Sequence, residues 1–255
     1  MKLDEIKIIG VVGGGVMGGG IAQTAILAGY TVIVRDLNYE ILARMKGVIV
    51  DGRFGLKKGL ALGKHTESQV QNALNNLSVT TNLEDLKQAD FIIEAIGGSN
   101  PQEIENKGIK LKLFQEIDMI IKKESIFASN TSRITIADLA TVTKRKDKFL
   151  GMHWFSPANI MKAVEVIWTQ DVTEENIKLV EDLCDKFGKI HVRVKDVPGD
   201  TGFVSNRIFG TARQEAQRIV DAGICTPEGI NTIMMNGFNW PYGPTGVSGV
   251  RTGWQ

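Results

Sequence analysis

This sequence of 255 residues contains few cysteines and carries almost no net charge. Its two cysteines are too few for a disulfide framework or a cysteine metal cluster, so we expect no metal site and a location in the cytoplasm or another reducing compartment. We assign Cys184 to the apolar face of a helix, as a core residue. The 30 basic and 29 acidic residues leave a formal net charge of +1, which argues against a nucleic-acid-binding surface.

Long apolar runs are missing as well. The sequence contains no apolar stretch of about eighteen residues, the length that a membrane-spanning helix needs. The first residues, Met-Lys-Leu-Asp-Glu, lack the apolar region of a secretory signal. We therefore expect a globular protein of one large or two unequal domains that binds neither nucleic acid nor a membrane.

Glycine, in contrast, is abundant, and its densest cluster follows the first apolar segment. Residues 6–12 are apolar without alternation, which is typical of a strand buried on both faces. A turn of the form Gly13-x-Gly15-x-x-Gly18 comes next, and an apolar helix over residues 21–28 follows it. A second strand, residues 31–35, ends in Asp36. This order predicts the first half of a dinucleotide-binding fold.

Each residue type in this motif has its own physical task. Gly13 permits a tight turn, Gly15 lets the backbone approach a pyrophosphate, and Gly18 allows the helix to pack closely on the strand. Asp36 lies 21 residues beyond Gly15, where a carboxylate can hold the adenosine ribose hydroxyls and repel a 2′-phosphate. We expect NAD rather than NADP, although Arg35 weakens that preference. The alternative is a plain strand–turn–helix of a parallel sheet.

Strand-like and helix-like segments alternate as far as residue 194. This alternation predicts an α/β fold of the Rossmann type, with a doubly wound, mostly parallel sheet. Helices are expected over residues 39–60, 66–74, 104–123 and 174–187, and strands over residues 77–80, 90–96, 125–128, 149–152, 163–168 and 191–194.

The pattern changes near Pro198. Two helices are expected, over residues 204–222 and 227–235, and no strand follows them. We therefore predict an NAD-binding domain over residues 1–196 and a small all-α domain over residues 197–255.

Hydride transfer from an alcohol needs a base that works near neutral pH, and histidine is the obvious candidate. His65 lies in a polar loop and is expected to be solvated. His191 belongs to a short strand, where a structural role is expected. His153 directly follows a predicted buried strand, at the sheet edge where open α/β sheets bind their ligands.

A carboxylate beside the base would orient it and stabilise its charged form. Glu165 is an acid in an otherwise apolar strand, so we expect it to have a partner. His153 and Lys162 are the two candidates. Glu94 is likewise an acid inside an apolar strand, and the sequence offers no equally good partner for it.

A basic cluster, Lys57, Lys58 and Lys64, ends the helical segment that follows Asp36. Such a cluster is usually a solvated face. The functional alternative is a binding surface for a polyphosphate tail such as that of coenzyme A.

Several sequence blocks together resemble the 3-hydroxyacyl-CoA dehydrogenase family, which includes bacterial 3-hydroxybutyryl-CoA dehydrogenases. The resemblance covers nearly the whole chain. The blocks are Gly-Val-Val-Gly-Gly-Gly-Val-Met-Gly-Gly-Gly-Ile-Ala (10–22), Ala-Ser-Asn-Thr-Ser (128–132), Gly-Met-His-Trp-Phe-Ser-Pro (151–157), Met-Lys-Ala-Val-Glu-Val-Ile (161–167) and Gly-Phe-Val-Ser-Asn-Arg (202–207).

The resemblance implies a catalytic set of four residues. His153 is the general base and Glu165 orients it, while Ser132 and Asn206 hold the hydroxyl and thioester oxygens of the substrate. The alternative for Ser132 is that it caps a helix expected over residues 136–139. The alternative for Asn206 is that it satisfies helix ends in the linker.

The resemblance also implies cofactor contacts. Glu105 and Lys110 match positions on the nicotinamide side of NAD, and Asn130 opens a turn near the cofactor. Val16 and Met17, within the glycine turn, complete the expected NAD-binding set. The implied reaction is the reversible, NAD-dependent oxidation of a short-chain L-3-hydroxyacyl-CoA to the 3-ketoacyl-CoA by a homodimer.

Some residues depart from the family pattern. Residues 97–103 look inserted, the link over residues 196–203 is longer, and Arg133 stands where the family usually has serine. Arg133 leaves open a related dehydrogenase that acts on a free hydroxy acid. The chain stops at Gln255, where family members continue through helices that help to form the dimer, so a non-catalytic NAD-binding protein is a further alternative.

Overall fold

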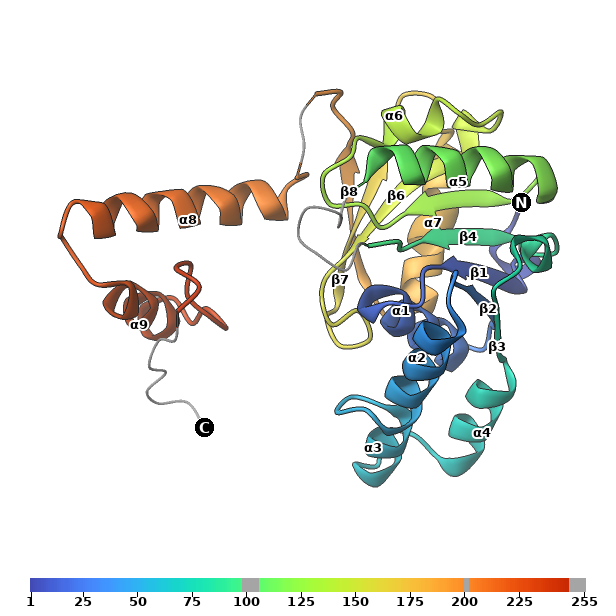
Figure 1. Ribbon diagram of the computed structural model, residues 1–255, viewed down its shortest axis with the longest axis horizontal. Helices are drawn as coiled ribbons and strands as arrows, with labels where there is room; N and C mark the ends of the chain where they lie inside the picture. The colour runs from blue at the N-terminus through green and yellow to red at the C-terminus, as the bar shows by residue number, and fades with distance from the viewer. Residues whose placement is uncertain (98–105, 200–201, 248–255) are drawn as a thin grey trace. The chain divides into compact units, whose positions relative to one another are not determined.

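The chain divides into two compact units in the computed structural model, which describes residues 1–97, 106–199 and 202–247. The first unit is Met1–Thr201 and the second is Gly202–Gln255. Figure 1 shows a sheet flanked by helices in the first unit and a pair of labelled helices in the described part of the second. The predicted α/β fold with a helical C-terminal part is confirmed.

An eight-stranded sheet with the order β3-β2-β1-β4-β5-β6-β7-β8 forms the centre of the first unit. β1 has β2 on one side and β4 on the other, so the winding reverses there, as in doubly wound folds. Neighbouring strands are parallel except for β6 and β7, which are antiparallel. The strands are β1 (Ile8–Val12), β2 (Thr31–Arg35), β3 (Leu77–Thr80), β4 (Phe91–Glu94), β5 (Ile126–Ser129), β6 (Phe149–Trp154), β7 (Ala163–Trp168) and β8 (Ile190–Lys195).

Helices cover both faces of the sheet, because its central strands are apolar on both sides. On one face, α1 and α7 join the core with Cys184, whose burial raises the pKa of its thiol to about 12. On the other face, Phe114 of α5 packs on Phe127 and Phe149 of the sheet. The helices are α1 (Val16–Leu27), α2 (Tyr39–Asp51), α3 (Leu56–Ala61), α4 (Glu67–Asn75), α5 (Lys107–Ile120), α6 (Ile136–Ala140) and α7 (Glu174–Lys186).

Several predicted elements differ in extent from the structure; the helix expected over residues 21–28, for example, is α1 and begins at Val16. The helix expected over residues 39–60 is broken into α2 and α3, because the chain turns at Gly52 and Gly55. The strand expected over residues 149–152 continues to Trp154, because β7 pairs with its last residues. His153 therefore lies within β6 and not in a loop after it.

The second unit contains α8 (Ser205–Asp221) and α9 (Pro227–Gly237). The ring of Phe209 of α8 packs against Trp240 and meets Tyr242 edge to face, and the buried Asn231 of α9 accepts a hydrogen bond from the Thr245 N–H. Within the described parts of both units, every helix is too short or too polar to cross a membrane.

Candidate active site

The glycine turn between β1 and α1 is shaped by close contacts that only glycine permits. Gly13 has a φ of 108°, in the region that other residues avoid, and a side chain there would meet the Ala95 carbonyl oxygen at 2.6 Å. A Cβ at Gly18 would lie 1.8 Å from the Gly13 carbonyl oxygen. A Cβ at Gly15 would have no neighbour within 4 Å. Gly15 thus faces open space at the start of α1.

That open space suits a pyrophosphate. No side chain caps Gly15, so the first amides of α1 point outward at the positive end of the helix dipole. Val16 is exposed and Met17 is half-buried in this first turn. The chemistry of these donors fits the phosphates of a dinucleotide.

Asp36 stands at the carboxyl end of β2, beside the glycine turn. Its Oδ2 accepts a hydrogen bond from the Gly14 N–H at 2.6 Å, and its Oδ1 accepts one from the Leu37 N–H at 2.7 Å. These amides fix the carboxylate, and each oxygen retains acceptor capacity for a ribose hydroxyl. Asp36 is the charge that would repel a 2′-phosphate, so the arrangement favours NAD.

His153 and Glu165 form the second part of the site. They lie directly opposite each other in the antiparallel pair of β6 and β7, and His153 Nδ1 is 2.6 Å from Glu165 Oε2. Both side chains are buried, with 9% and 7% of their surfaces exposed. Of the two partners expected for Glu165, the structure pairs it with His153.

This contact sets the chemistry of the ring. A carboxylate only accepts hydrogen bonds, so the Nδ1–H of His153 donates to Glu165 and the lone pair of the neutral imidazole lies on Nε2. Nε2 can then take a proton from a substrate hydroxyl, and the buried carboxylate stabilises the imidazolium that forms.

The base and the glycine turn share one edge of the sheet. Val12, Glu94, Ser129 and Gly151 are paired in one row across β1, β4, β5 and β6, and His153 is two residues further along its strand. Two strand spacings, roughly 10 Å, separate β4 from β6. A ligand that extends from the glycine turn across β4 and β5 would end beside the imidazole.

Comparisons with known proteins agree with this geometry. The model of the 3-hydroxyacyl-CoA dehydrogenase NAD-binding domain matches residues 8–197, and that of the C-terminal domain matches residues 202–252. The chain belongs to the 3-hydroxyacyl-CoA dehydrogenase family. It is therefore an NAD-dependent oxidoreductase, and its cofactor is NAD.

Several relatives match most of the chain. A Deinococcus radiodurans protein named "Probable 3-hydroxybutyryl-CoA dehydrogenase" is 41% identical over 92% of this chain and 80% of its own length. The rat protein named mitochondrial hydroxyacyl-coenzyme A dehydrogenase is 37% identical over 94% of this chain and 74% of its own. The crystal structure of (S)-3-hydroxybutyryl-CoA dehydrogenase from Ralstonia eutropha has a TM-score of 0.82 and 35% identity, covering 94% of this chain and 80% of that one.

The turn after β5 carries two further residues that the family resemblance implicated. Asn130 accepts a hydrogen bond from the Trp154 N–H at 2.9 Å through its Oδ1, so its side chain ties β5 to β6. Ser132 is half-buried and does not cap the helix that follows, because α6 begins after Thr135 and Asp196 accepts the Ala137 N–H. The capping alternative for Ser132 is therefore wrong.

Glu94 has the partner that the sequence did not reveal. Its Oε1 accepts a hydrogen bond from Lys110 Nζ at 2.6 Å, and both side chains are buried. The signal available in the sequence was a lysine on the apolar face of the helix that follows, three residues before Leu113 and four before Phe114. Lys110 therefore lies in a buried ion pair on the nicotinamide side of β1.

Glu105 and Asn206 also belong to the expected set. Glu105 lies outside the described residues, as do most of the residues predicted to be inserted. Asn206 is in the first turn of α8, which belongs to the second unit. Their roles stay predictions.

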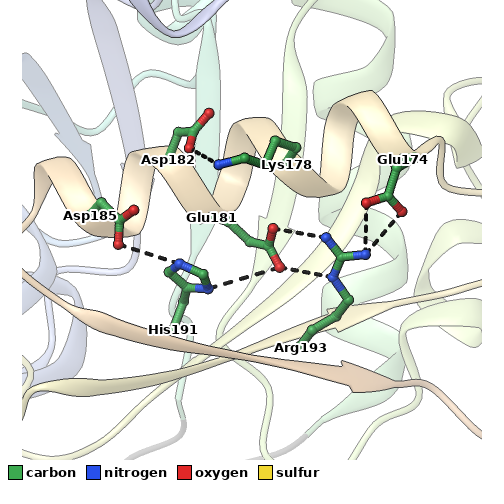
Figure 2. A network of polar contacts seen from close by, with 7 residues as sticks. All are labelled: Glu174, Lys178, Glu181, Asp182, Asp185, His191 and Arg193. Carbon is green, nitrogen blue, oxygen red and sulfur yellow. Dashed lines mark hydrogen bonds and ion pairs between the residues drawn. The ribbon is translucent and has the colours of Figure 1, made fainter.

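The other histidines lie away from the row that leads from the glycine turn to His153. His65 is half-buried and not fully solvated, because its ring packs on Gly59 of α3. His191, on β8, contacts two acids of α7, with Nε2 3.3 Å from Asp185 and Nδ1 3.9 Å from Glu181 (Figure 2). Its expected structural role fits these contacts.

Proposed function

We propose that this protein oxidises short-chain L-3-hydroxyacyl-CoA thioesters to 3-ketoacyl-CoA with NAD, using His153 as the general base. The observation that carries the proposal is the buried contact between His153 and Glu165 at the sheet edge that also holds the glycine turn. The names of the relatives support the substrate class.

In the proposed reaction, Nε2 of His153 takes the proton of the C3 hydroxyl while the C3–H bond breaks. When bound, NAD supplies the acceptor for that hydride. The remaining electron pair of the O–H bond forms the C3 carbonyl, so the products are the 3-keto thioester, NADH and an imidazolium. Glu165 stabilises that imidazolium and keeps the ring in the productive tautomer.

Ser132 and Asn206 are proposed to bind the substrate. The hydroxyl of Ser132, on the turn after β5, would donate a hydrogen bond to the C3 oxygen, and the Asn206 amide would do the same for the thioester oxygen. Donors at these positions stabilise the charge that develops on oxygen in the transition state.

The coenzyme A part of the substrate has a candidate site between α1 and α2. A cavity of about 350 Å³ lies there and reaches from Gly14 and Gly15 of the glycine turn to the loop that follows β6, so the tail would share this cavity with the phosphates of NAD. Arg44 and Arg53 supply positive charge to its lining, and the aromatic ring of Phe54 supplies an apolar surface. This combination supports a site for a phosphorylated nucleotide tail, and the exposed Lys58 of α3 is proposed as a further phosphate contact.

A substrate panel tests this function. Formation of NADH, read at about 340 nm, is expected with L-3-hydroxybutyryl-CoA and NAD, and much less with free 3-hydroxybutyrate or with NADP. Oxidation of free hydroxy acids in preference to the thioester would replace the proposal with the alternative that Arg133 suggests. Tight NADH binding without turnover of any hydroxyacyl substrate would make the protein a non-catalytic NAD binder.

We also propose that the protein works in the cytoplasm, in fatty-acid β-oxidation, as a homodimer. Both cysteines are free, which favours a reducing compartment. Ile208, Ile224 and Phe238 of the second unit are each at least 69% exposed, which supports self-association through that unit. Light scattering on a size-exclusion column should give twice the monomer mass, and a monomer would contradict the dimer.

A further inference from the structure

The buried ion pair of Glu94 and Lys110 lies at the sheet edge that binds the cofactor, outside the set proposed for proton transfer. We propose that Glu94 is a positioning residue for NAD: with Lys110 it forms a clamp that shapes the nicotinamide-side wall of the dinucleotide groove. The inference rests on the dinucleotide site and is independent of the acyl-CoA specificity proposed above.

The clamp holds the chain where it leaves β4. Glu94 Oε1 accepts hydrogen bonds from the Ile96 N–H at 2.6 Å and from Lys110 Nζ at 2.6 Å. Lys110 Nζ also donates to the Ile96 carbonyl at 3.0 Å. Both polar groups of Ile96 are thereby fixed by the same ion pair.

This segment forms one wall of the groove. The Ala95 N–H donates to the Val12 carbonyl at 2.8 Å, and a Cβ added at Gly13 would lie 3.1 Å from the Ile96 nitrogen. β4 is next to β1 on the side away from β2, whose last residue precedes Asp36. Since Asp36 marks the adenosine side, the clamped segment lies on the nicotinamide side.

The other carboxylate oxygen reaches the next turn. Ser129 donates its hydroxyl hydrogen to Glu94 Oε2 at 2.5 Å, and the Ser129 Oγ accepts the Thr131 N–H at 3.2 Å. The Asn130 N–H donates to the Glu94 carbonyl at 2.7 Å. Glu94 thus connects the turns after β4 and β5, which flank the path from the glycine turn to His153.

Stability alone is a poor explanation for this pair. Glu94 is 0% exposed and Lys110 2%, and removing two charges from water costs so much that an apolar pair of similar volume is often as stable. An ion pair does make the contact directional, because each charged group accepts or donates hydrogen bonds with a defined geometry. In this protein the partners of those hydrogen bonds are Ile96 and Ser129, which lie at the groove.

The primary test is the Glu94→Gln variant of the full chain, titrated with NADH and with ADP by fluorescence or calorimetry. We expect the Kd for NADH to rise about tenfold, the scale of losing a group that orients a binding residue. The Kd for ADP should change by less than about twofold, because ADP occupies only the adenosine side. This variant retains Lys110. If the sole role of Lys110 were to contact NAD directly, the Kd for NADH would not change.

Glu94→Gln leaves the Lys110 cation buried without its counter-charge, so a second variant guards against misfolding. The double variant Glu94→Gln/Lys110→Met carries no charge at this position and should fold, with a circular dichroism spectrum like that of the parent. It too should bind NADH about tenfold more weakly, with ADP binding retained.

The chain offers a matched control at the other end of the same elements. Lys122, just beyond α5, pairs with Asp90, just before β4, at 2.7 Å. Lys122→Met also removes an ion pair between these segments, but at the opposite edge of the sheet, so both Kd values should stay within about twofold of the parent. Unchanged NADH binding in the folded Glu94 variants overturns the proposal, and so does an equal loss in Lys122→Met.

Discussion

Two histidines of this protein contact carboxylates from within the sheet, yet their surroundings differ. His153 lies in an interior strand, and Glu165 is opposite it on the neighbouring strand. His191 lies in the edge strand β8 and faces α7, whose Glu181 also accepts hydrogen bonds from both Arg193 Nε and Nη2 (Figure 2). The first pair is buried at the ligand edge, and the second is part of a half-exposed charge network.

The comparison shows that a histidine–carboxylate contact does not by itself indicate catalysis. In the α7–β8 network, the charge of Glu181 is compensated by a guanidinium, which holds the pKa of the Glu181 carboxyl below its usual range. Glu165 lies opposite an imidazole whose other nitrogen can serve a substrate. Position at the carboxyl edge, beside the glycine turn, distinguishes the two.

The largest expected difference is between His153→Ala and His191→Ala. Removing the base should lower kcat by a factor on the order of 100 or more, because the other two histidines, His65 and His191, lie away from the ligand edge. His191→Ala should keep kcat within about twofold. NADH formation from L-3-hydroxybutyryl-CoA measures both, and an NADH titration confirms that the cofactor site is intact. Full activity in His153→Ala would remove this residue from the mechanism.

A smaller difference is expected between Glu165→Gln and Glu181→Gln. Glu165→Gln keeps the side-chain length but removes the charge that stabilises the imidazolium, so kcat should fall about 10- to 100-fold. The KM for the thioester should change little, because the loss is confined to the transition state. Glu181→Gln is the matched control, and an equal loss of kcat there would erase the distinction between the two sites.

The smallest effect is on stability and concerns Arg193→Met. The pKa of Glu181 is lowered in the folded state, first by its hydrogen bonds to Arg193, so ionised Glu181 contributes stability above its unfolded pKa, roughly 4.3. That contribution is lost as the pH falls through the lower, folded pKa. Arg193→Met should therefore reduce the free energy of unfolding by about 1 kcal/mol at pH 7.

Urea unfolding at pH 7 and near pH 3.5 measures this effect. The difference between the parent and Arg193→Met should shrink at the lower pH, since protonation of Glu181 weakens the same interaction in the parent. If the difference in the free energy of unfolding stays constant with pH, the aliphatic part of the Arg193 side chain stabilises the fold by packing. Activity per folded molecule should be unchanged at pH 7.

Much of the fold was predictable because its signals are local. The apolar segment, the glycine turn and Asp36 follow one another within thirty-one residues, 6–36, and each has a backbone or packing requirement that few residue types meet. The break between α2 and α3 was missed although Gly52 and Gly55 were visible, because the apolar periodicity continued across them.

The site was predictable only in part, since its contacts join residues far apart in the chain. Glu165 had two candidate partners, and the choice of His153 followed from the antiparallel register of β6 and β7. Lys110 is 16 residues from Glu94 and reaches it only because α5 packs across β4 and β5. Spacing along the chain carries no information about such contacts.

By itself, the sequence determined the alternation of strands and helices, the dinucleotide turn and the acid that selects NAD, because local sterics and hydrophobic periodicity dictate them. Only the tertiary structure decided which carboxylate faces His153, that this ring lies inside a strand, and that Glu94 is paired with a lysine. Those outcomes depend on strand register and helix packing, through which the burial of the whole core chooses the neighbours of each charged group.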